Sequence, residues 1–510
     1  MKLYSIKYKF GVILTLLFVN NIILAQNDFN EIKIDAEITH VQPMTGIVFW
    51  DGQHQNIGVE VTSLEFSYML YSDVVQEQGV YDWTVVENKL NQIASRGHQA
   101  VFRFRYVYVG EETAVPDYIK ALPGYHETEG VSEGENTWFP DWTNQELQNF
   151  TLEFYTKFAE KYDNDPRLAF LETGFGLWAE YHIYDGPFEP GVTFPSKEFQ
   201  IKFFRHMDTT FINIPFMISI DAANNEYSPF DEHPELLNIK FGNFDDSFMN
   251  EDFDVPGEYN TESWEFFGPD RYKYSPEGGE FSYYTTYDQK HVLDWPDGPY
   301  GKPYEYFAKK YHISFIIGND QPLYQTKERI KQAGMASGYL FKIVSFFSKQ
   351  DSSVVLVKNL GTAPIYYDAY VAVNDVRSEI SLKNLAPGDS IVCPVSAGGE
   401  NPKLTVISDR LVEGQSIEYL GTENFLKTVN KNEPEFLIFP NPVKQNESFT
   451  VSTGSVITKT LKIYNINGQL KYSSRFDNAS VISVIGWPKG IYLVSVDNGR
   501  NTIVKKLIVR

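Results

Sequence analysis

The stretch LAFLETGFGLWAEYHIYD, residues 168–185, gathers acidic and aromatic side chains in a short length of chain. Its acidic residues and histidine are Glu172, Glu180, His182 and Asp185. Aromatic rings beside carboxyl groups form a surface on which a sugar ring can stack while an acid acts on it. A strand that ends in solvated acids is the alternative interpretation. The stretch therefore predicts either acid–base chemistry on a carbohydrate or a polar loop.

Hydrolysis of a glycosidic bond needs two carboxyl groups, one that donates a proton and one that acts as nucleophile or base. We expect Glu180 to be the acid/base, with Glu172 or Asp221 as the second carboxyl group. His182 is a further candidate for proton transfer, and a hydrogen-bonded loop histidine is its alternative interpretation.

Two arginines lie on one face of the strand that ends in VFRFR, because side chains alternate along a strand. The guanidinium groups of Arg103 and Arg105 suit a carboxylate or a sulfate, so both are predicted to bind an anionic substrate. A buried arginine needs an anionic partner in any case. An ion pair with an internal acid such as Glu172 is therefore the alternative, and both can hold together.

Further binding residues are expected near these acids. Trp178 and Tyr181 lie in the same loop and offer rings for stacking on a sugar. The stretch LNIKFGNFDD, residues 237–246, reads as a short strand ending near Asn243, Asp245 and Asp246. We expect Asn243 and Asp245 to contact the substrate.

Alternating strands and helices predict how these residues are positioned. Residues 26–350 favour a parallel sheet, and a (β/α)₈ TIM-like barrel is the best single prediction. The expected strands are 47–50, 64–71, 99–108, 168–171, 215–220, 238–244, 313–317 and 339–347, and the expected helices are 84–96, 146–162, 196–211, 304–311 and 326–336. Residues 250–303 read as one long irregular insertion. A barrel presents its working residues at the carboxyl ends of its strands.

The rest of the chain divides by composition. Residues 351–422 alternate tightly between apolar and polar side chains and predict an antiparallel β-sandwich. Residues 423–435 are polar and predict a linker. Residues 436–510 predict a small all-β module, with hairpin turns at Asn467-Gly468 and Asn498-Gly499.

Composition and the first residues limit the possible functions. Residues 1–25 have a basic start, a short apolar run and a small residue before Gln26, which predicts a signal peptide. No later stretch is apolar enough to span a bilayer. The net charge of −23 argues against nucleic acid as a partner. Cys393 is the only cysteine, so no intramolecular disulfide can form.

Metal sites have little support in the sequence. It contains no HExxH motif and no cysteine cluster, so we expect no metal and no cofactor. The acidic run from Asp245 to Asp254 could hold a structural calcium ion. It lacks the ligand spacing of an EF-hand loop, and a solvated loop is favoured.

The carboxy-terminal module closely resembles the C-terminal sorting domain of the type IX secretion system. The matching motifs are Pro440-Asn441-Pro442, the run from Ile463 to Gln469, Gly490-Ile491-Tyr492-Leu493 and Lys505-Lys506. The resemblance implies a bacterium of the Bacteroidota type and the type IX machinery as partner. It also implies a protein that is secreted or attached to the outer-membrane surface. A generic β-sandwich appendage is the alternative.

A second resemblance covers roughly residues 40–420. The run Gly176-Leu177-Trp178-Ala179-Glu180-Tyr181-His182 resembles the G-L-W-G-E-W-H motif of a family of secreted, glycoside-hydrolase-like barrels classed as a domain of unknown function. The resemblance implies a carbohydrate-active barrel with Glu180 as the prime catalytic candidate. Ala179 stands where the motif has Gly, and Tyr181 stands where it has Trp.

These features together predict a secreted enzyme that hydrolyses an anionic polysaccharide, uronic or sulfated and possibly algal such as ulvan, or its oligosaccharides. A lyase or dehydratase acting by elimination on a uronic-acid sugar is the alternative within enzymes. Arginines would neutralise the sugar carboxylate, and His182 or Tyr181 would act as base. A surface glycan-binding protein without catalysis is the alternative of another class.

Overall fold

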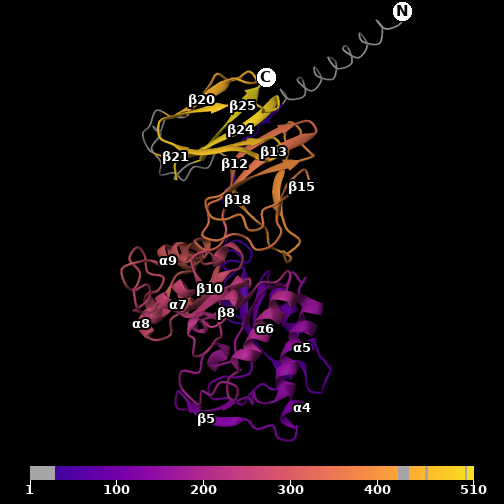
Figure 1. The fold of residues 1–510 in the computed structure, drawn as a ribbon, viewed down its shortest axis with the longest axis vertical. Helices are drawn as coiled ribbons and strands as arrows, with labels where there is room; N and C mark the ends of the chain where they lie inside the picture. The colour runs from indigo at the N-terminus through magenta and orange to yellow at the C-terminus, as the bar shows by residue number, and fades with distance from the viewer. Residues whose placement is uncertain (1–28, 423–435, 454–457, 500–501) are drawn as a thin grey trace, which may run out of the picture.

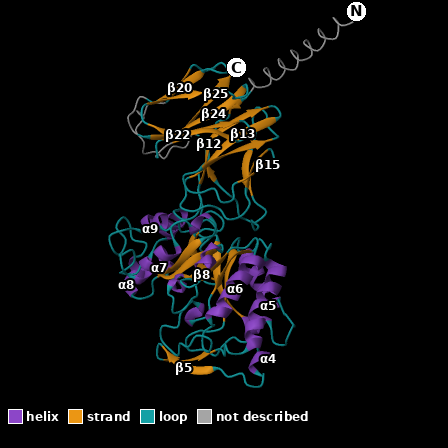
Figure 2. Cartoon of the chain, in the orientation of Figure 1, coloured by secondary structure: helices purple, strands orange, loops and turns teal. Residues whose placement is uncertain are grey.

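The computed structural model describes residues 29–422, 436–453, 458–499 and 502–510. Figure 1 shows a barrel at one end of an elongated molecule and β-rich units at the other end. Helices surround the barrel, whereas the other units consist of strands and loops (Figure 2). The predicted signal peptide and the predicted linker at 423–435 lie outside the described residues. Within the described part of the chain, no helix has the length and apolar character needed to cross a membrane.

Eight strands form a closed barrel in the order β10-β11-β2-β3-β4-β7-β8-β9, and every neighbouring pair is parallel. The predicted TIM-like barrel is confirmed. Its strands are β2 (Gly46–Trp50), β3 (Leu64–Leu70), β4 (Gln99–Arg105), β7 (Leu168–Thr173), β8 (Phe216–Ser219), β9 (Phe241–Phe248), β10 (Glu277–Phe281) and β11 (Phe315–Ile317).

Two predictions about the barrel strands were wrong. Residues 250–303 are not one irregular insertion, because they contain α7 (Tyr259–Phe267), the barrel strand β10 and α8 (Thr286–His291). The strand expected at 339–347 is β12 (Phe341–Lys349), and it lies outside the barrel. It pairs antiparallel with β13 (Ser352–Asn359) and so belongs to the sandwich.

The longer helices begin at side-chain caps that can be read from the sequence. Asn144 accepts hydrogen bonds from the backbone N–H groups of Glu146 and Leu147 at the start of α5 (Gln145–Tyr162), and Ser196 caps α6 (Lys197–Thr210). Their buried faces pack against the outside of the barrel. The remaining helices and turns are α2 (Tyr71–Val74), α3 (Thr84–Ala94), α4 (Asp117–Lys120), α9 (Tyr304–Lys310), α10 (Gln321–Tyr324), α11 (Lys327–Met335), η1 (Leu177–Ala179), η2 (Ile220–Ala223), η3 (Pro234–Asn238) and η4 (Arg271–Lys273).

Apolar side chains from several strands meet inside the amino-terminal half of the barrel. Phe170 stacks on Phe315 with ring centroids 5.2 Å apart, and Phe244 lies 6.4 Å from Phe315. The same buried cluster continues into the sandwich, where the Tyr367 hydroxyl donates to the Ala169 carbonyl. The amino-terminal end of the barrel is therefore closed by the sandwich, which leaves the carboxyl ends of the strands for a site.

The sandwich consists of two sheets. One contains β1 (Asn30–Glu31), β12, β13, β16 (Ser390–Val395) and β18 (Tyr419–Leu420), and the other contains β14 (Tyr370–Val373), β15 (Val376–Ser381) and β17 (Leu404–Ile407). The first sheet also packs on the carboxy-terminal module through a small apolar cluster.

The carboxy-terminal module has a core of its own and is all-β, as predicted. Its sheets have the orders β19-β20-β23 and β22-β21-β24-β25. The strands are β19 (Leu437–Phe439), β20 (Ser448–Ser452), β21 (Lys459–Asn465), β22 (Leu470–Phe476), β23 (Ala479–Ser483), β24 (Gly490–Asp497) and β25 (Thr502–Val509).

Candidate active site

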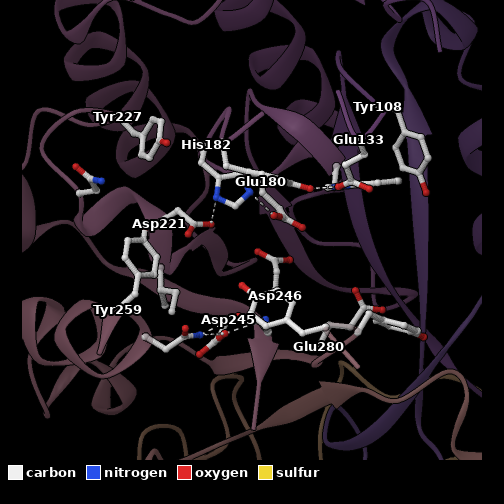
Figure 3. A pocket seen from close by; sticks show the side chains of 18 of the residues that line it. Tyr108, Glu133, Glu180, His182, Asp221, Tyr227, Asp245, Asp246, Tyr259 and Glu280 are labelled. Atoms are coloured by element: carbon white, nitrogen blue, oxygen red, sulfur yellow. Dashed lines mark hydrogen bonds and ion pairs between the residues drawn. The ribbon is translucent and has the colours of Figure 1, made fainter. Parts of the chain in front are cut away.

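A cavity of about 860 Å³ opens at the carboxyl ends of the barrel strands. Its lining is rich in carboxyl groups and aromatic rings, several of which are labelled in Figure 3. The carboxyl groups are Glu133, Glu180, Asp221, Asp245, Asp246, Glu280 and Asp320, and the rings are Trp50, Tyr68, Tyr108, Trp178, Tyr184, Tyr227, Tyr259, Tyr283 and Tyr284. This is the end of a barrel at which catalytic residues are expected.

The loop after β7 folds back on itself and so presents Glu180 to the cavity. The N–H groups of Phe175 and Gly176 both donate to the Glu180 carbonyl, at 2.9 and 2.8 Å. A Cβ on Gly176 would lie 1.8 Å from the His182 carbonyl oxygen, so only glycine allows this approach. Ala179 has φ = 59°, in the region that favours glycine, and this explains why glycine suits that position of the motif.

Glu180, His182 and Asp221 form a chain of two carboxyl groups joined by an imidazole ring (Figure 3). His182 Nε2 lies 2.8 Å from Glu180 Oε2, and His182 Nδ1 lies 3.1 Å from Asp221 Oδ2. The Ser219 hydroxyl also donates to Asp221 Oδ2, at 2.5 Å. The structure thus brings together three of the four predicted catalytic residues.

The surroundings of these three groups favour different protonation states. Burial, reinforced by the charge of Asp246, raises the pKa of Glu180 to about 8. Burial opposes a charge on His182, but Asp221 and Glu180 together raise the pKa of its imidazole well above the usual value. Burial likewise opposes a charge on Asp221, and His182 outweighs it, so the pKa of Asp221 is lowered. At neutral pH the arrangement favours a protonated Glu180 beside an imidazolium and an ionised Asp221.

Glu172, the fourth predicted catalytic residue, lies beneath the cavity and does not line it. Its side chain is 1% exposed, and its Oε2 accepts a hydrogen bond of 2.9 Å from Arg103 Nε. Arg103 Nη2 also donates to Asp246 Oδ1 at 3.0 Å, and its guanidinium lies 4.4 Å from the centre of the Phe244 ring. Burial raises the pKa of Glu172 to about 8 although Arg103 opposes the shift. Arg103 therefore pairs with internal acids, which is one of its two predicted interpretations.

Arg105 is also absent from the cavity lining. Its Nη2 lies 2.5 Å from Glu111 Oε2, and its guanidinium lies 4.3 Å from the centre of the Tyr108 ring. Tyr108 itself lines the cavity, so Arg105 packs against the ring of a lining residue without lining the cavity itself.

The two aromatic residues predicted to stack on a sugar lie in different places. Trp178 lines the cavity, and its Nε1 donates to Glu133 Oε1 at 3.1 Å. Tyr181 is fully buried on the other side of the loop, where its hydroxyl donates to Gln200 Oε1 at 3.2 Å and its ring stacks on Phe204. Tyr181 is thus a core residue away from the cavity.

The two predicted binding residues of β9 are also separated. Asn243 is fully buried outside the cavity lining, and its backbone N–H donates to Glu277 Oε2 at 3.2 Å. Asp245 lines the cavity and accepts hydrogen bonds of 2.8 Å from both Asn260 Nδ2 and Trp264 Nε1. Burial raises the pKa of Asp245 to about 7, and these donors oppose the shift.

Several residues of the cavity were not predicted. Asp246 follows Asp245 on β9 and has no predicted role, yet it points toward Glu180 and Asp221 (Figure 3). Glu280 was missed because the surrounding EGGEF does not read as a strand. Glu133 comes from the hairpin of β5 (Thr128–Ser132) and β6 (Glu135–Phe139), and no motif pointed to it.

Among the described residues, Glu180, His182 and Asp221 could hold a metal ion, because one donor atom of each lies within 4.8 Å of the others. Each ring nitrogen of His182 already faces a carboxyl group, however, which suits an imidazolium better than a metal ligand. In the acidic run considered for calcium, Asp254 pairs with Lys302 and Lys310.

Residues 437–510 match the family model described as "Secretion system C-terminal sorting domain". The match confirms the predicted sorting domain and the predicted type IX route. The protein is therefore secreted or attached to the cell surface, and the secretion machinery is a partner.

No curated protein matches the chain in sequence. Among solved structures, the catalytic domain of a beta-amylase from Paenibacillus polymyxa is 10% identical, with 55% of this chain and 92% of that chain covered and a TM-score of 0.34. A beta-galactosidase from Halorubrum lacusprofundi is 9% identical, with coverages of 53% and 52% and a TM-score of 0.32. A GH36 alpha-galactosidase from Geobacillus stearothermophilus is 9% identical, with coverages of 72% and 56% and a TM-score of 0.32.

Proposed function

We propose that this protein is a secreted glycoside hydrolase that acts on a polysaccharide or its oligosaccharides. The observation that carries the proposal is the pair formed by Glu180 and Asp246, which face each other in a cavity lined by tyrosine and tryptophan rings (Figure 3). Hydrolysis of an acetal needs an acid and an ionised carboxylate on two sides of the bond. Rings around the mouth supply surfaces on which sugar rings stack.

Glu180 is proposed as the general acid. Its pKa of about 8 keeps it protonated at neutral pH, and a protonated carboxyl group can donate to the oxygen of the leaving sugar. The imidazolium of His182 lies between Asp221 and Glu180, and its contact with Glu180 fixes the position of this carboxyl group. In this proposal His182 and Asp221 are positioning residues.

Asp246 is proposed as the second carboxyl group, in preference to the predicted Glu172 or Asp221. Its Oδ1 is held by Arg103, and its Oδ2 has no hydrogen-bond partner within the described residues. Burial raises the pKa of Asp246, and Arg103 opposes the shift and favours the ionised form. Glu172 makes its contacts below the cavity, and Asp221 is occupied by His182 and Ser219.

Elimination on a uronic-acid sugar has less support than hydrolysis. It needs a base near the sugar, but His182 is held in its charged form and Tyr181 is buried in the core. It also needs a cation beside the sugar carboxylate. The arginines predicted for that role bind Glu172, Asp246 and Glu111. The same contacts weaken the case for an anionic glycan such as ulvan, which stays a prediction from the sequence.

A panel of neutral, amine-bearing, uronic and sulfated polysaccharides tests the proposed function. Hydrolysis is expected to release reducing ends without new ultraviolet absorbance. Elimination would instead produce an absorbing conjugated double bond. If no glycan in the panel is cleaved under any condition while some are bound, the protein is a glycan-binding protein and the proposal fails.

The pH dependence of the reaction follows from the acid role of Glu180. The protonated form is the active one, so kcat/KM is expected to fall as the pH rises through about 8, roughly tenfold per pH unit above it. Initial rates on a cleaved glycan across this range, with protein stability checked at each pH, measure the effect. A rate that stays flat well above pH 8 would exclude Glu180 as the acid.

A further inference from the structure

One side of the cavity carries two acids that take no part in the proposed chemistry. Glu280 lies at the end of β10, and Asp320 follows the end of the adjacent strand β11. The two strands are paired, with Glu280 beside Ile317, so both acids reach the same part of the rim. The charges of both also act, after burial, to raise the pKa of the Tyr283 hydroxyl, which lines the cavity as well.

In the part of the chain that the structure describes, the carboxyl groups of Glu280 and Asp320 have few hydrogen-bond donors around them. Glu280 Oε1 is shielded from solvent and has no hydrogen-bond partner within the described residues. Asp320 precedes α10, but its side chain makes no capping hydrogen bond there. A shielded carboxylate oxygen without a donor is costly, so a ligand that brings a donor is favoured.

The rest of the lining supplies no free cation. Of the described residues that line the cavity, none is lysine or arginine. His182 faces Glu180 and Asp221, and Arg103 lies below the floor against Glu172 and Asp246. A ligand with a carboxylate or a sulfate would therefore meet acids on several sides and no opposing charge.

We propose that Glu280 and Asp320 bind the ammonium group of an amino sugar, so that the glycan taken by this cavity carries free amines and no anionic groups. The inference rests on the proposed function for the identity of the ligand as a sugar. An ammonium group donates up to three hydrogen bonds, which suits two neighbouring carboxyl groups, one with an oxygen that has no partner among the described residues and the other with no capping hydrogen bond. Hydrogen bonds between ionised partners are also roughly twice as strong as neutral ones.

Binding of an ammonium group should also change the protonation of Glu280. Burial, followed by the charge of Asp246, raises the pKa of Glu280 well above its usual value, so the free protein holds a proton on this carboxyl group. An ammonium favours the ionised form and displaces that proton. Affinity for an amino sugar is therefore expected to rise with pH over the range in which the amine stays charged. A uronic acid would show the opposite trend.

Ligand titrations of the full chain by nuclear magnetic resonance test the inference. The probes are glucosamine, galactosamine and mannosamine, each compared with its N-acetylated form and with the corresponding uronic acid. At least one amino sugar is expected to bind on the order of tenfold more tightly than its N-acetylated form. Equal binding of the N-acetylated or uronic forms, or no binding of any amino sugar, would overturn the inference.

Charge-neutral variants test whether Glu280 and Asp320 cause the preference for amino sugars over their N-acetylated forms. Glu280→Gln keeps the shape of the side chain and is expected to remove most of the preference for the amine. Asp320→Asn should act in the same direction and serves if the first variant does not fold. Glu226→Gln removes one charge from an exposed residue outside the lining, so it should keep the preference. A preference unchanged in both lining variants would contradict the assignment.

The proposed function and this inference can fail separately. Selective binding of amino sugars without cleavage of any glycan would leave the inference standing and remove the hydrolase. Cleavage of a uronic, sulfated or uncharged glycan, with no preference for amines, would support the hydrolase and overturn the inference about amino sugars.

Discussion

Glu180→Gln is expected to lower kcat on a cleaved glycan by roughly 10²- to 10⁴-fold while ligand affinity changes little. Glutamine fills the same space and can still contact His182, but its amide is not acidic and cannot transfer a proton to the leaving oxygen. Turnover by reducing-end release and affinity by titration separate the two effects. A variant that loses binding and turnover together would instead indicate a role in holding the substrate.

The leaving group provides a sharper check of the same residue. An aryl glycoside with a strongly acidic phenol departs without protonation, so Glu180→Gln should affect its cleavage much less than cleavage of the natural linkage. Glu226→Gln is the matched control, because it makes the same chemical change at an exposed position outside the cavity. Equal losses on both substrates would argue against general acid catalysis by Glu180.

Arg103→Met is expected to lower the free energy of unfolding by about 3–5 kcal/mol, because it leaves Glu172 and Asp246 without their buried counter-charge. Arg103→Lys keeps the charge but cannot contact both acids with the same fork, so a smaller loss is expected. Urea unfolding followed by fluorescence measures both variants. A loss as large in the lysine variant would show that shape, and not charge, governs this position.

The loss of unfolding free energy in Arg103→Met should depend on pH. Burial already raises the pKa of Glu172 to about 8, so this carboxyl group ionises more easily in the unfolded chain than in the fold. Removal of Arg103 raises that pKa further. Below about pH 7 both folded proteins hold this proton, so the group adds no difference between them. The difference from the wild type should therefore grow as the pH rises through about 8, where only the wild-type fold ionises it, and a loss independent of pH would contradict the prediction.

Most of the barrel could be predicted because its helices and strands carry strong local signals. Asn144 and Ser196 mark two helix starts, and VFRFR is a clear strand. Strand β10 gives no such signal, because Gly278 and Gly279 have low strand propensity. The close packing of the barrel requires glycine at position 279, because a Cβ there would lie 2.3 Å from the Asp245 carbonyl oxygen. The sequence also cannot tell which sheet a strand joins, and β12 was therefore assigned to the wrong one.

The residues of the candidate site likewise divide into those that a local sequence pattern indicates and those that it does not. Glu180, His182 and Asp221 could be proposed because strand ends and their loops converge in a barrel. The partners of Arg103 depend on distances across the barrel, which no local pattern contains. Tyr181 and Trp178 are three residues apart in one loop, yet Trp178 lines the cavity and Tyr181 is buried in the core. Glu280 could not be found before its strand was recognised.

The apolar cluster that runs from Phe170 and Phe315 to Tyr367 has a consequence for how the protein comes apart. Barrel and sandwich share this cluster, so they should melt as a single cooperative unit. The sorting domain has a separate core, so its removal should leave the core of the barrel intact. Its removal would, however, uncover Leu356 and Val392 and leave a small exposed apolar patch on the sandwich.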